Sequence, residues 1–268
     1  MRGFKYSKIS IDGRNANCWL AESDICVDLP AFIAKIEDHL SSAKILKDSR
    51  SVKAGISSFK GRNLFVKRYN DRGLAYRIRY MFKAPRPVNV LRVFSHLKSK
   101  AVGFRIPEYF GAVYGASICG AQSYTIQEAI EDSVSAFDVC RLAFASDGGK
   151  ENLAWRLCET LSNMHRAGIA HMDPKLSNFI FTGAPDDFSC GMWDFDVSKI
   201  RNRISLPERE RELARTASSF VDLGNRLGVL VLVDEAISLF SSSYGKLSGF
   251  IPRREKLILF AKKFLKGK

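Results

Sequence analysis

The order of two residue patterns along the chain limits the folds that it can adopt. In the first half, short apolar segments separated by turn residues indicate strands, with a single helical pattern at 88–100 among them. In the second half, apolar residues recur at spacings of three and four, most clearly at 153–164, and Gly168 follows as a C-terminal cap. The expected strands cover residues 45–54, 63–69, 108–113 and 123–128. This order predicts an α+β protein with a small strand-rich lobe at 1–130 and a mostly helical lobe at 131–268.

Composition excludes several classes of protein. A hydrophobic fraction of 46% with 26% charged residues is typical of a globular protein and argues against disorder. The longest apolar run, 227–233, is far shorter than a bilayer span, and residues 1–10 do not resemble a signal peptide, so we expect a cytoplasmic protein without a transmembrane helix. The six cysteines form no C-x-x-C pair and have no His at metal-ligand spacing. They therefore predict reduced, structural thiols rather than disulfides or a zinc site.

Positive charge is concentrated in one part of the sequence. The formal net charge is +14, and Lys and Arg exceed Asp and Glu by the same number within residues 47–105. Such a field favours a polyanionic partner: nucleic acid, an anionic membrane surface, or a phosphorylated or carboxylated substrate. The interleaved aromatic and basic residues at 72–105 fit a solvated helix face, a single-strand nucleic-acid surface or an interfacial membrane segment. The basic tail 253–268 predicts a terminal helix that packs on its own lobe or contacts a membrane.

Several oxygen-bearing side chains follow the helix at 153–164, and their spacing indicates the chemistry of the protein. Asp173 precedes Lys175 and Asn178, and a predicted hairpin then leads to Asp194 in an Asp-Phe-Asp triplet. Phosphoryl transfer needs a carboxylate that orients and deprotonates the acceptor hydroxyl, and oxygen ligands that hold Mg²⁺ on the nucleotide phosphates. The spacing matches the H-x-D-x-x-x-x-N loop and the D-F-x turn of kinases. We assign Asp173 as the base, Asn178 and Asp194 as metal ligands, and Lys175 to the charge on the transferred group. His171 is expected to position the loop.

The strand-rich half supplies candidates for nucleotide binding. Lys67 lies in an apolar strand and fits the lysine that holds the α and β phosphates, and Glu128 ends the segment expected to carry adenine against backbone amides. Two usual parts are missing. No G-x-G-x-x-G precedes Lys67, because the loop expected at 49–56 contains only Gly55, and the helical segment after Lys67 has no Asp or Glu. In the metal-binding turn, Asp196 replaces the usual Gly. These departures favour a weak or inactive enzyme.

Taken together, the motifs resemble the bacterial lipopolysaccharide-core kinase family, which phosphorylates Kdo or heptose and has a protein-kinase-like two-lobe fold. The resemblance covers roughly residues 45–225 and rests on four segments and on the Asp173, Asn178 and Asp194 set. The four segments are 65–70, 72–87, 103–107 and 123–128. The resemblance implies an ATP- and Mg²⁺-dependent kinase whose acceptor is an acidic glycolipid or phosphosugar, with peripheral contact at the inner face of the cytoplasmic membrane. A basic linker in place of an acidic helix is also similar to that family, which weakens the argument for inactivity.

Two other interpretations stay open. The acceptor is a protein Ser or Thr or a small alcohol, since D-x-K suits protein substrates and Met172 departs from the more usual Gly or Arg beside the base. Alternatively, the chain is a pseudokinase or a basic membrane or nucleic-acid adaptor, because the Gly-rich loop and the acidic helix residue are missing. We favour the sugar kinase because a small neutral alcohol gives no reason for the positive field. No nucleic-acid partner is expected, and the oligomeric state stays open.

Overall fold

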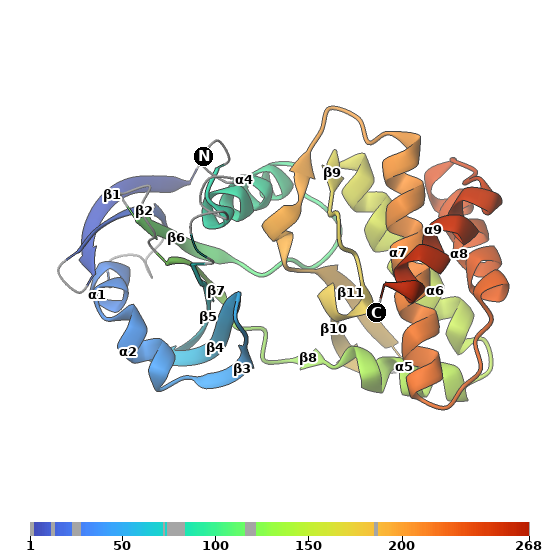
Figure 1. Cartoon of the computed structure of the whole chain (residues 1–268), viewed down its shortest axis with the longest axis horizontal. Helices are drawn as coiled ribbons and strands as arrows, with labels where there is room; N and C mark the ends of the chain where they lie inside the picture. The colour runs from blue at the N-terminus through green and yellow to red at the C-terminus, as the bar shows by residue number, and fades with distance from the viewer. Residues whose placement is uncertain are drawn as a thin grey trace. The chain divides into compact units, whose positions relative to one another are not determined.

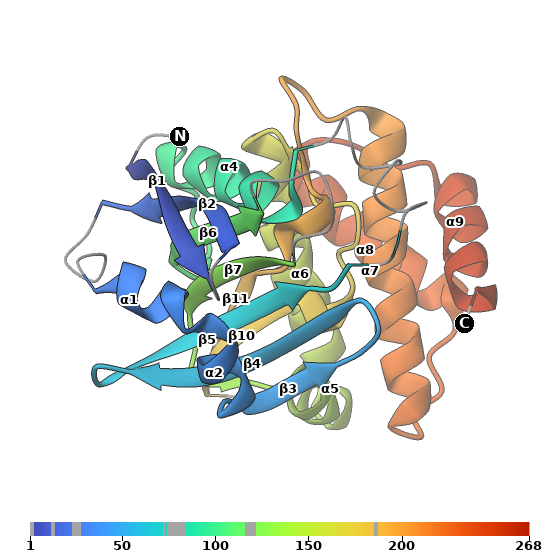
Figure 2. The same ribbon diagram turned by 60° about the vertical axis from the view of Figure 1, so that its left-hand side comes forward.

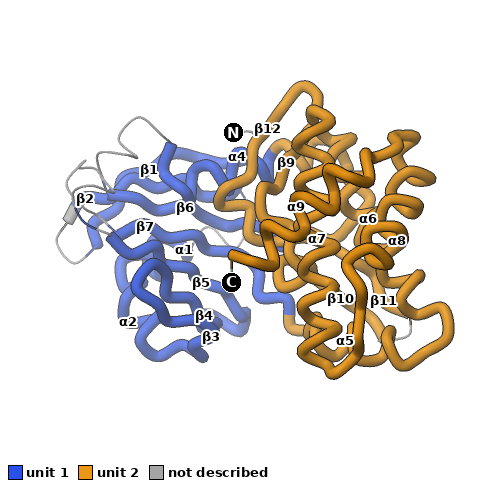
Figure 3. Tube along the Cα trace, turned by 45° about the vertical axis from the view of Figure 1, so that its right-hand side comes forward, with its two compact units in different colours: residues 1–95, 107–130 blue, residues 96–106, 131–268 orange. Residues whose placement is uncertain are grey.

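The computed structural model describes residues 3–11, 14–22, 28–71, 73, 84–115, 122–184 and 187–267. The chain forms two compact units, which Figure 3 shows in different colours. Unit 1 contains residues 1–95 and 107–130, and unit 2 contains residues 96–106 and 131–268. Residues 96–106 therefore belong to unit 2 although they precede the last two strands of the sheet in unit 1.

Unit 1 is built on a seven-stranded sheet whose neighbouring strands are antiparallel (Figures 1 and 2). The order across the sheet is β1-β2-β6-β7-β5-β4-β3. The strands are β1 Phe4–Ile11, β2 Arg14–Ala21, β3 Lys44–Asp48, β4 Val52–Phe59, β5 Arg62–Tyr69, β6 Tyr109–Gly115 and β7 Ser123–Glu128. Helices α1 Leu29–Ala34 and α2 Ile36–Ser41 follow β2, and α4 Arg86–Ser99 runs from unit 1 into unit 2.

The sequence patterns located β5, β6, β7 and α4, but they missed the first hairpin and the two short helices. The predicted single strand at 45–54 is wrong, because a turn at residues 49–51 divides it into β3 and β4. Helices α1 and α2 have six residues each, so their apolar spacing repeats too few times to stand out. The dipeptide Asp12-Gly13, between two alternating segments, was the signal that would have predicted the pairing of β1 with β2.

One face of the sheet carries the core of unit 1. Fully buried side chains of α1 and α2 pack there against side chains of β2, β5 and β7; they include Phe32, Ile33, Ile36, Leu40, Cys18, Leu64, Val66 and Ile126. Successive side chains of a strand point to opposite faces. Because Leu64 and Val66 face this core, Lys67 and Tyr69 lie on the other face of β5. Arg86, the first residue of α4, has its guanidinium 5.7 Å from the centre of the Tyr69 ring.

The turn between β3 and β4 is polar rather than glycine-rich. Gly55 lies inside β4, which corrects the expected loop at 49–56; a Cβ atom there would lie 2.9 Å from the backbone oxygen of Lys44. The turn itself is Ser49-Arg50-Ser51. The Asn70 side chain donates to the backbone oxygen of Ser49 at 3.1 Å, and the Asn70 N–H donates to that of Ser51 at 3.0 Å. These bonds fasten the turn to the end of β5.

Unit 2 is mostly helical, as predicted. Its longer helices are α5 Ala136–Ala145, α6 Gly149–Arg166, α7 Leu206–Arg226, α8 Val233–Ser248 and α9 Arg254–Lys266. Its short elements are β8 Ser133–Val134, β9 Ile169–Ala170, η2 Leu176–Asn178, β10 Phe179–Ala184, β11 Asp187–Met192, η3 Phe195–Val197 and β12 Lys199–Ile200. The helix and the hairpin expected around the chemical motif are confirmed as α6 and as the antiparallel pair β10 and β11. Gly168 ends α6 with a left-handed φ of +78°, which favours glycine.

The basic tail forms α9, which confirms the predicted terminal helix. Leu257 and Ala261 are buried where α9 packs on α7 and α8 in the same unit. The lysines of α9 at 256, 262, 263 and 266 are exposed. Within the described part of the chain, no helix is both long and apolar enough to cross a bilayer.

An ion pair between a buried carboxylate and Arg253 fixes the start of α9. The Glu210 side chain is 1% exposed and accepts bonds from Nε and Nη2 of Arg253 at 2.7 and 2.6 Å and from its N–H at 3.0 Å. The Arg253 hydrogen bonds hold the pKa of Glu210 below its ordinary value. A lowered carboxyl pKa stabilises the fold above the ordinary value of about 4.3, and that contribution is lost as pH falls through the lowered pKa.

We therefore expect Arg253→Ala to raise the pH midpoint of acid unfolding, followed by circular dichroism between pH 7 and 2. The matched control is Arg254→Ala, whose partner Asp234 is exposed, as is Arg254 itself. Exposed pairs contribute little, so the control should unfold like the wild type. Equal midpoints for Arg253→Ala and the wild type would contradict this role for Glu210.

The described cysteines are buried and free, as the sequence predicted, and their thiols should react slowly. Burial raises the pKa of Cys18, Cys140 and Cys190 to about 12 and that of Cys158 well above its ordinary value. The thiolate is the reactive form, so few of these groups are reactive at pH 8. We expect at most two of the six cysteines to react quickly with a thiol reagent in the native protein, and all six in denaturant. Three or more fast thiols would contradict the burial.

Candidate active site

His171 fixes the loop at 171–178 from the inside. Its side chain is fully buried, and Nε2–H donates to the backbone oxygen of Trp193 at 2.8 Å. Its Nδ1 accepts the N–H of Asp173 at 3.4 Å, and its ring lies 5.4 Å from the ring of Phe195. Both ring nitrogens are engaged inside the protein. This geometry supports the positioning role expected for His171.

Trp193 joins this loop to the turn that carries Asp194. Its N–H donates to the backbone oxygen of Asn178 at 3.1 Å, and its indole N–H donates to that of Ser177 at 2.9 Å. With the bond from His171, three hydrogen bonds hold Trp193 to the loop. Asp194 is the next residue, so the same bonds place its backbone beside that loop.

Asp173 is held by two cations from its own unit. Arg215 Nε donates to Oδ1 at 2.9 Å, and Lys175 Nζ lies 3.4 Å from Oδ2. The Asp173 side chain is 36% exposed, whereas that of Arg215 is 18% exposed. The carboxylate is thus fixed in orientation and still reaches solvent, as a group that contacts a substrate hydroxyl must.

Asn178 and Asp194 supply oxygen atoms on the two sides of Trp193. Asn178 is 5% exposed and its Nδ2 donates to the backbone oxygen of Asp173 at 2.9 Å, so Oδ1 is the atom that could bind a metal ion. Asp194 has φ 63° and ψ 53°, a left-handed conformation that is uncommon for a residue other than Gly. Phe195 is fully buried directly after it. One amide oxygen and one carboxylate are hard donors that suit Mg²⁺, which commonly takes few protein ligands and keeps phosphate and water as the others.

One face of α7 forms hydrogen bonds to the loop at 171–178. Thr216 Oγ1 donates to the backbone oxygen of Pro174 at 2.7 Å, and the N–H of Leu176 donates to Ser219 Oγ at 3.0 Å. Residues three and four apart share one face of a helix, so these contacts belong to the same face as Arg215. The loop therefore rests on a rigid element.

A buried carboxylate on α7 holds Met172, the residue before Asp173. Glu212 is 2% exposed; its Oε1 accepts the N–H of Met172 at 2.5 Å, and His165 Nε2 lies 2.9 Å from its Oε2. His165 Nδ1 lies 2.6 Å from the hydroxyl of Tyr244, whose pKa burial raises to about 12. Met172 has a φ of +73°, a conformation that its own N–H bond to Glu212 helps to fix. The chain of contacts runs from α8 through α6 and α7 to the loop.

Sequence reasoning identified the loop residues but missed Glu212 and Arg215. One signal was available for Glu212: it lies four residues before Thr216 and eight before Phe220, on the side that helical spacing assigns to the interior. A carboxylate at such a position requires a buried partner.

Lys67 and Glu128 lie in unit 1. Lys67 stands on β5 opposite Ala54 and Thr125, both small and buried, and its Nζ is 5.2 Å from the centre of the Tyr69 ring. The N–H of Glu128 donates to the backbone oxygen of Glu108 at 2.7 Å, and its carboxylate accepts the N–H of Glu108 at 3.0 Å. The N–H and the carboxylate of Glu128 are therefore both engaged within unit 1.

The chain has an antiparallel sheet with Lys67 on one strand, followed by a helical unit with an Asp-x-Lys-x-x-Asn loop and an Asp-Phe-Asp turn. This combination defines a kinase of the protein-kinase-like fold. The family model described as "Lipopolysaccharide kinase (Kdo/WaaP) family" matches residues 31–235, and the chain belongs to this family. It is therefore a phosphotransferase with an alcohol group as acceptor.

A solved structure titled "WaaP in complex with acyl carrier protein" has a similar fold. It is 16% identical in sequence, with a TM-score of 0.57 over 86% of this chain and 91% of that chain. The likeness confirms the predicted α+β, kinase-like fold class. No curated protein matches the sequence.

Glu212 should act as a positioning residue for the loop. We expect Glu212→Ala to lower kcat by about a hundredfold, because a displacement of about 1 Å in a reacting group has that effect. Glu212→Gln should keep most activity, since an amide can accept the Met172 N–H and donate to His165. Initial rates at saturating substrates, with circular dichroism to verify folding, measure this. Equal losses in the two variants would contradict positioning through these hydrogen bonds.

Proposed function

We propose that the protein transfers the γ-phosphoryl group of ATP, as its Mg²⁺ complex, to a sugar hydroxyl of the lipopolysaccharide inner core, on Kdo or heptose. The observation that carries the proposal is the bonding of Trp193 to the loop, which brings the backbone of Asp194 next to that of Asn178, with Asp173 held in the same loop. Family membership supports a saccharide acceptor.

Each residue of the loop has a distinct proposed role. Asp173 orients the acceptor hydroxyl and takes its proton, while Arg215 and Lys175 keep the carboxylate in place. Lys175 is also within reach of charge on the transferred group. Asn178 Oδ1 and the Asp194 carboxylate would hold Mg²⁺. Bound there, Mg²⁺ would neutralise charge on the phosphates and orient them.

We also propose nucleotide-binding roles for residues of unit 1. Lys67 suits the α and β phosphates because it lies on an apolar strand of the sheet, as the phosphate-binding lysine of kinases does. The carbonyl oxygen of Glu128 would face adenine. The polar turn Ser49-Arg50-Ser51, held by Asn70, takes the place of a Gly-rich loop.

The charge distribution supports an acidic acceptor at a membrane. The positive segment 47–105 and the exposed lysines of α9 both favour an anionic glycolipid or phosphosugar. We therefore propose a cytoplasmic protein that makes peripheral contact with the inner face of the cytoplasmic membrane.

Transfer of labelled phosphate from ATP to purified core glycolipids tests the proposal. We expect Asp173→Ala to lower kcat by about a hundredfold or more, the usual effect of removing a positioned base. Asp194→Ala should abolish Mg²⁺-dependent transfer. The matched control is Asp187→Ala, an exposed carboxylate on β11 of the adjoining hairpin, which should keep full activity.

Other acceptors would give different results in the same assay. Label on proteins of a lysate but not on glycolipid would show a protein kinase. Nucleotide binding without turnover, unaltered in Asp173→Ala, would show a pseudokinase, as the absence of acidic residues from α4 allows. Loss of one phosphate from the core oligosaccharide of a deletion strain, measured by mass spectrometry, is the expected result in cells.

A further inference from the structure

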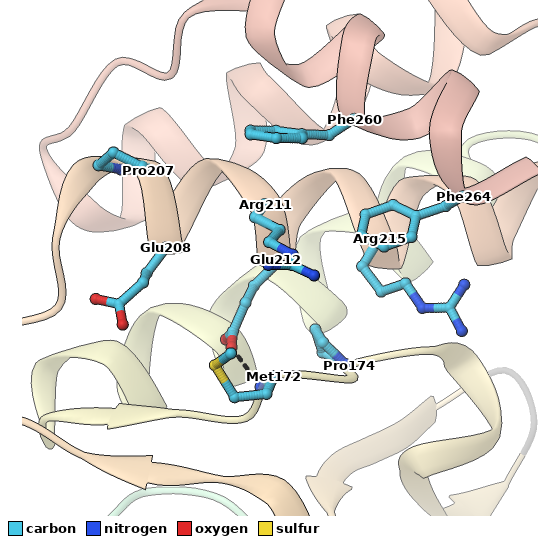
Figure 4. Close-up of a pocket in the computed structure, with 9 residues that line it drawn as sticks. All are labelled: Met172, Pro174, Pro207, Glu208, Arg211, Glu212, Arg215, Phe260 and Phe264. Carbon is cyan, nitrogen blue, oxygen red and sulfur yellow. Dashed lines mark hydrogen bonds between the residues drawn. The ribbon is translucent and has the colours of Figure 1, made fainter. Parts of the chain in front are cut away.

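A cavity of about 210 Å³ opens beside the loop, entirely within unit 2 (Figure 4). Met172 and Pro174, the two neighbours of Asp173 in the chain, line one side of it. Figure 4 shows Arg211 and Arg215 entering from α7, with Phe260 and Phe264 of α9 across from the loop. Arg215 is also the residue that bonds the Asp173 carboxylate, so the cavity is one side chain away from the proposed base.

The charges around the cavity leave one cation available. Arg215 is engaged with Asp173 and lies 5.1 Å from the centre of the Phe264 ring. Glu208 is engaged by Ser205 and Arg201, and Glu212 is engaged by Met172 and His165. Both carboxylates of the lining are thus already paired. Arg211 is exposed, and it makes no ion pair or hydrogen bond with any residue that the structure describes.

The shape and lining restrict the ligand. Pockets for drug-sized molecules have volumes of about 300–1,000 Å³, so this smaller cavity suits one sugar unit rather than a lipid or an oligosaccharide. Phe260 and Phe264 are half-buried and four residues apart, so they present neighbouring rings on one side of α9. A guanidinium opposite aromatic rings suits a compact ring that carries an anionic group, because Arg binds carboxylate and phosphate in a planar, bidentate manner.

We propose that this cavity binds an acidic sugar unit adjacent to the one that is phosphorylated, with Arg211 on its carboxylate or phosphate and Phe260 and Phe264 against its ring. The inference rests on the proposed function for the identity of the acceptor, but the binding step needs no turnover. The cavity sets the direction from which the acceptor reaches Asp173, and so contributes to the choice of hydroxyl.

Titration calorimetry without nucleotide tests the proposal directly. The probes are Kdo for a sugar carboxylate, glucose 6-phosphate for a sugar phosphate, and glucose as the neutral sugar. At least one acidic probe should bind the wild type more tightly than glucose, and the tighter one identifies the anionic group. Arg211→Ala should weaken that binding about tenfold or more, the value of a lost charge-assisted hydrogen bond. Arg211→Lys should fall between, because a point charge cannot bind in the bidentate manner.

Arg226→Ala is the matched control, since Arg226 is an exposed arginine on the last turn of the same helix and lies outside the cavity. It should bind the probes like the wild type. Equal losses in Arg211→Ala and Arg226→Ala, or no preference for either acidic probe over glucose, would overturn the proposal. In the kinase assay Arg211→Ala should raise the acceptor KM and leave the KM for ATP unchanged. Probe binding that depends on Arg211 in a protein without kinase activity would support the cavity while rejecting the proposed function.

Discussion

The three hydrogen bonds that hold Trp193 to the loop at 171–178 are the constraint on which the site depends. They act together with the Ser198 hydroxyl, which donates to the backbone oxygen of His171 at 3.1 Å, and with the pairing of β9 and β12. With them, the backbone of Trp193 lies between Asn178 and the buried ring of His171. Peptide groups that are buried must be paired. The same bonds that satisfy this requirement therefore set the position of the residue that follows, Asp194.

Helix α7 supports the loop at 171–178 through several contacts. It contributes a cation to Asp173, hydroxyl contacts to Pro174 and Leu176, and a buried carboxylate to the N–H of Met172. A buried carboxylate is costly unless it is fully bonded, and Glu212 meets that condition through Met172 and His165. Residues that contact substrate are best held by elements that do not move with it. In this protein, the candidate loop at 171–178 is supported at four points by one helix.

The sequence predicted those elements whose residue pattern lies within one short segment of the chain. Helix α6 repeats its apolar positions between residues 153 and 164 and is followed by Gly168, and the tail helix α9 repeats them between residues 257 and 265, so both were found. The candidate loop was found because Asp173, Asn178 and Asp194 keep a fixed spacing in the chain.

The features that were missed depend on contacts between distant segments. Glu212 acquires its role from Met172, which precedes it by 40 positions, and no spacing rule connects the two. Similarly, Gly55 was expected in a loop at 49–56, but it lies in β4, where the close approach of Lys44 explains the glycine. The strand error at 45–54 has the same origin, since the Ser49-Arg50-Ser51 turn is fixed by Asn70, which directly follows β5. Tertiary contacts decided these elements, and local propensity did not.

The most direct measurement is a crystal structure of the protein with Mg²⁺ and a non-hydrolysable ATP analogue. The account predicts a metal ion with Asn178 Oδ1 and an Asp194 carboxylate oxygen each at about 2.1 Å, the usual Mg²⁺–oxygen distance. A fully occupied nucleotide whose metal contacts neither residue would contradict the account.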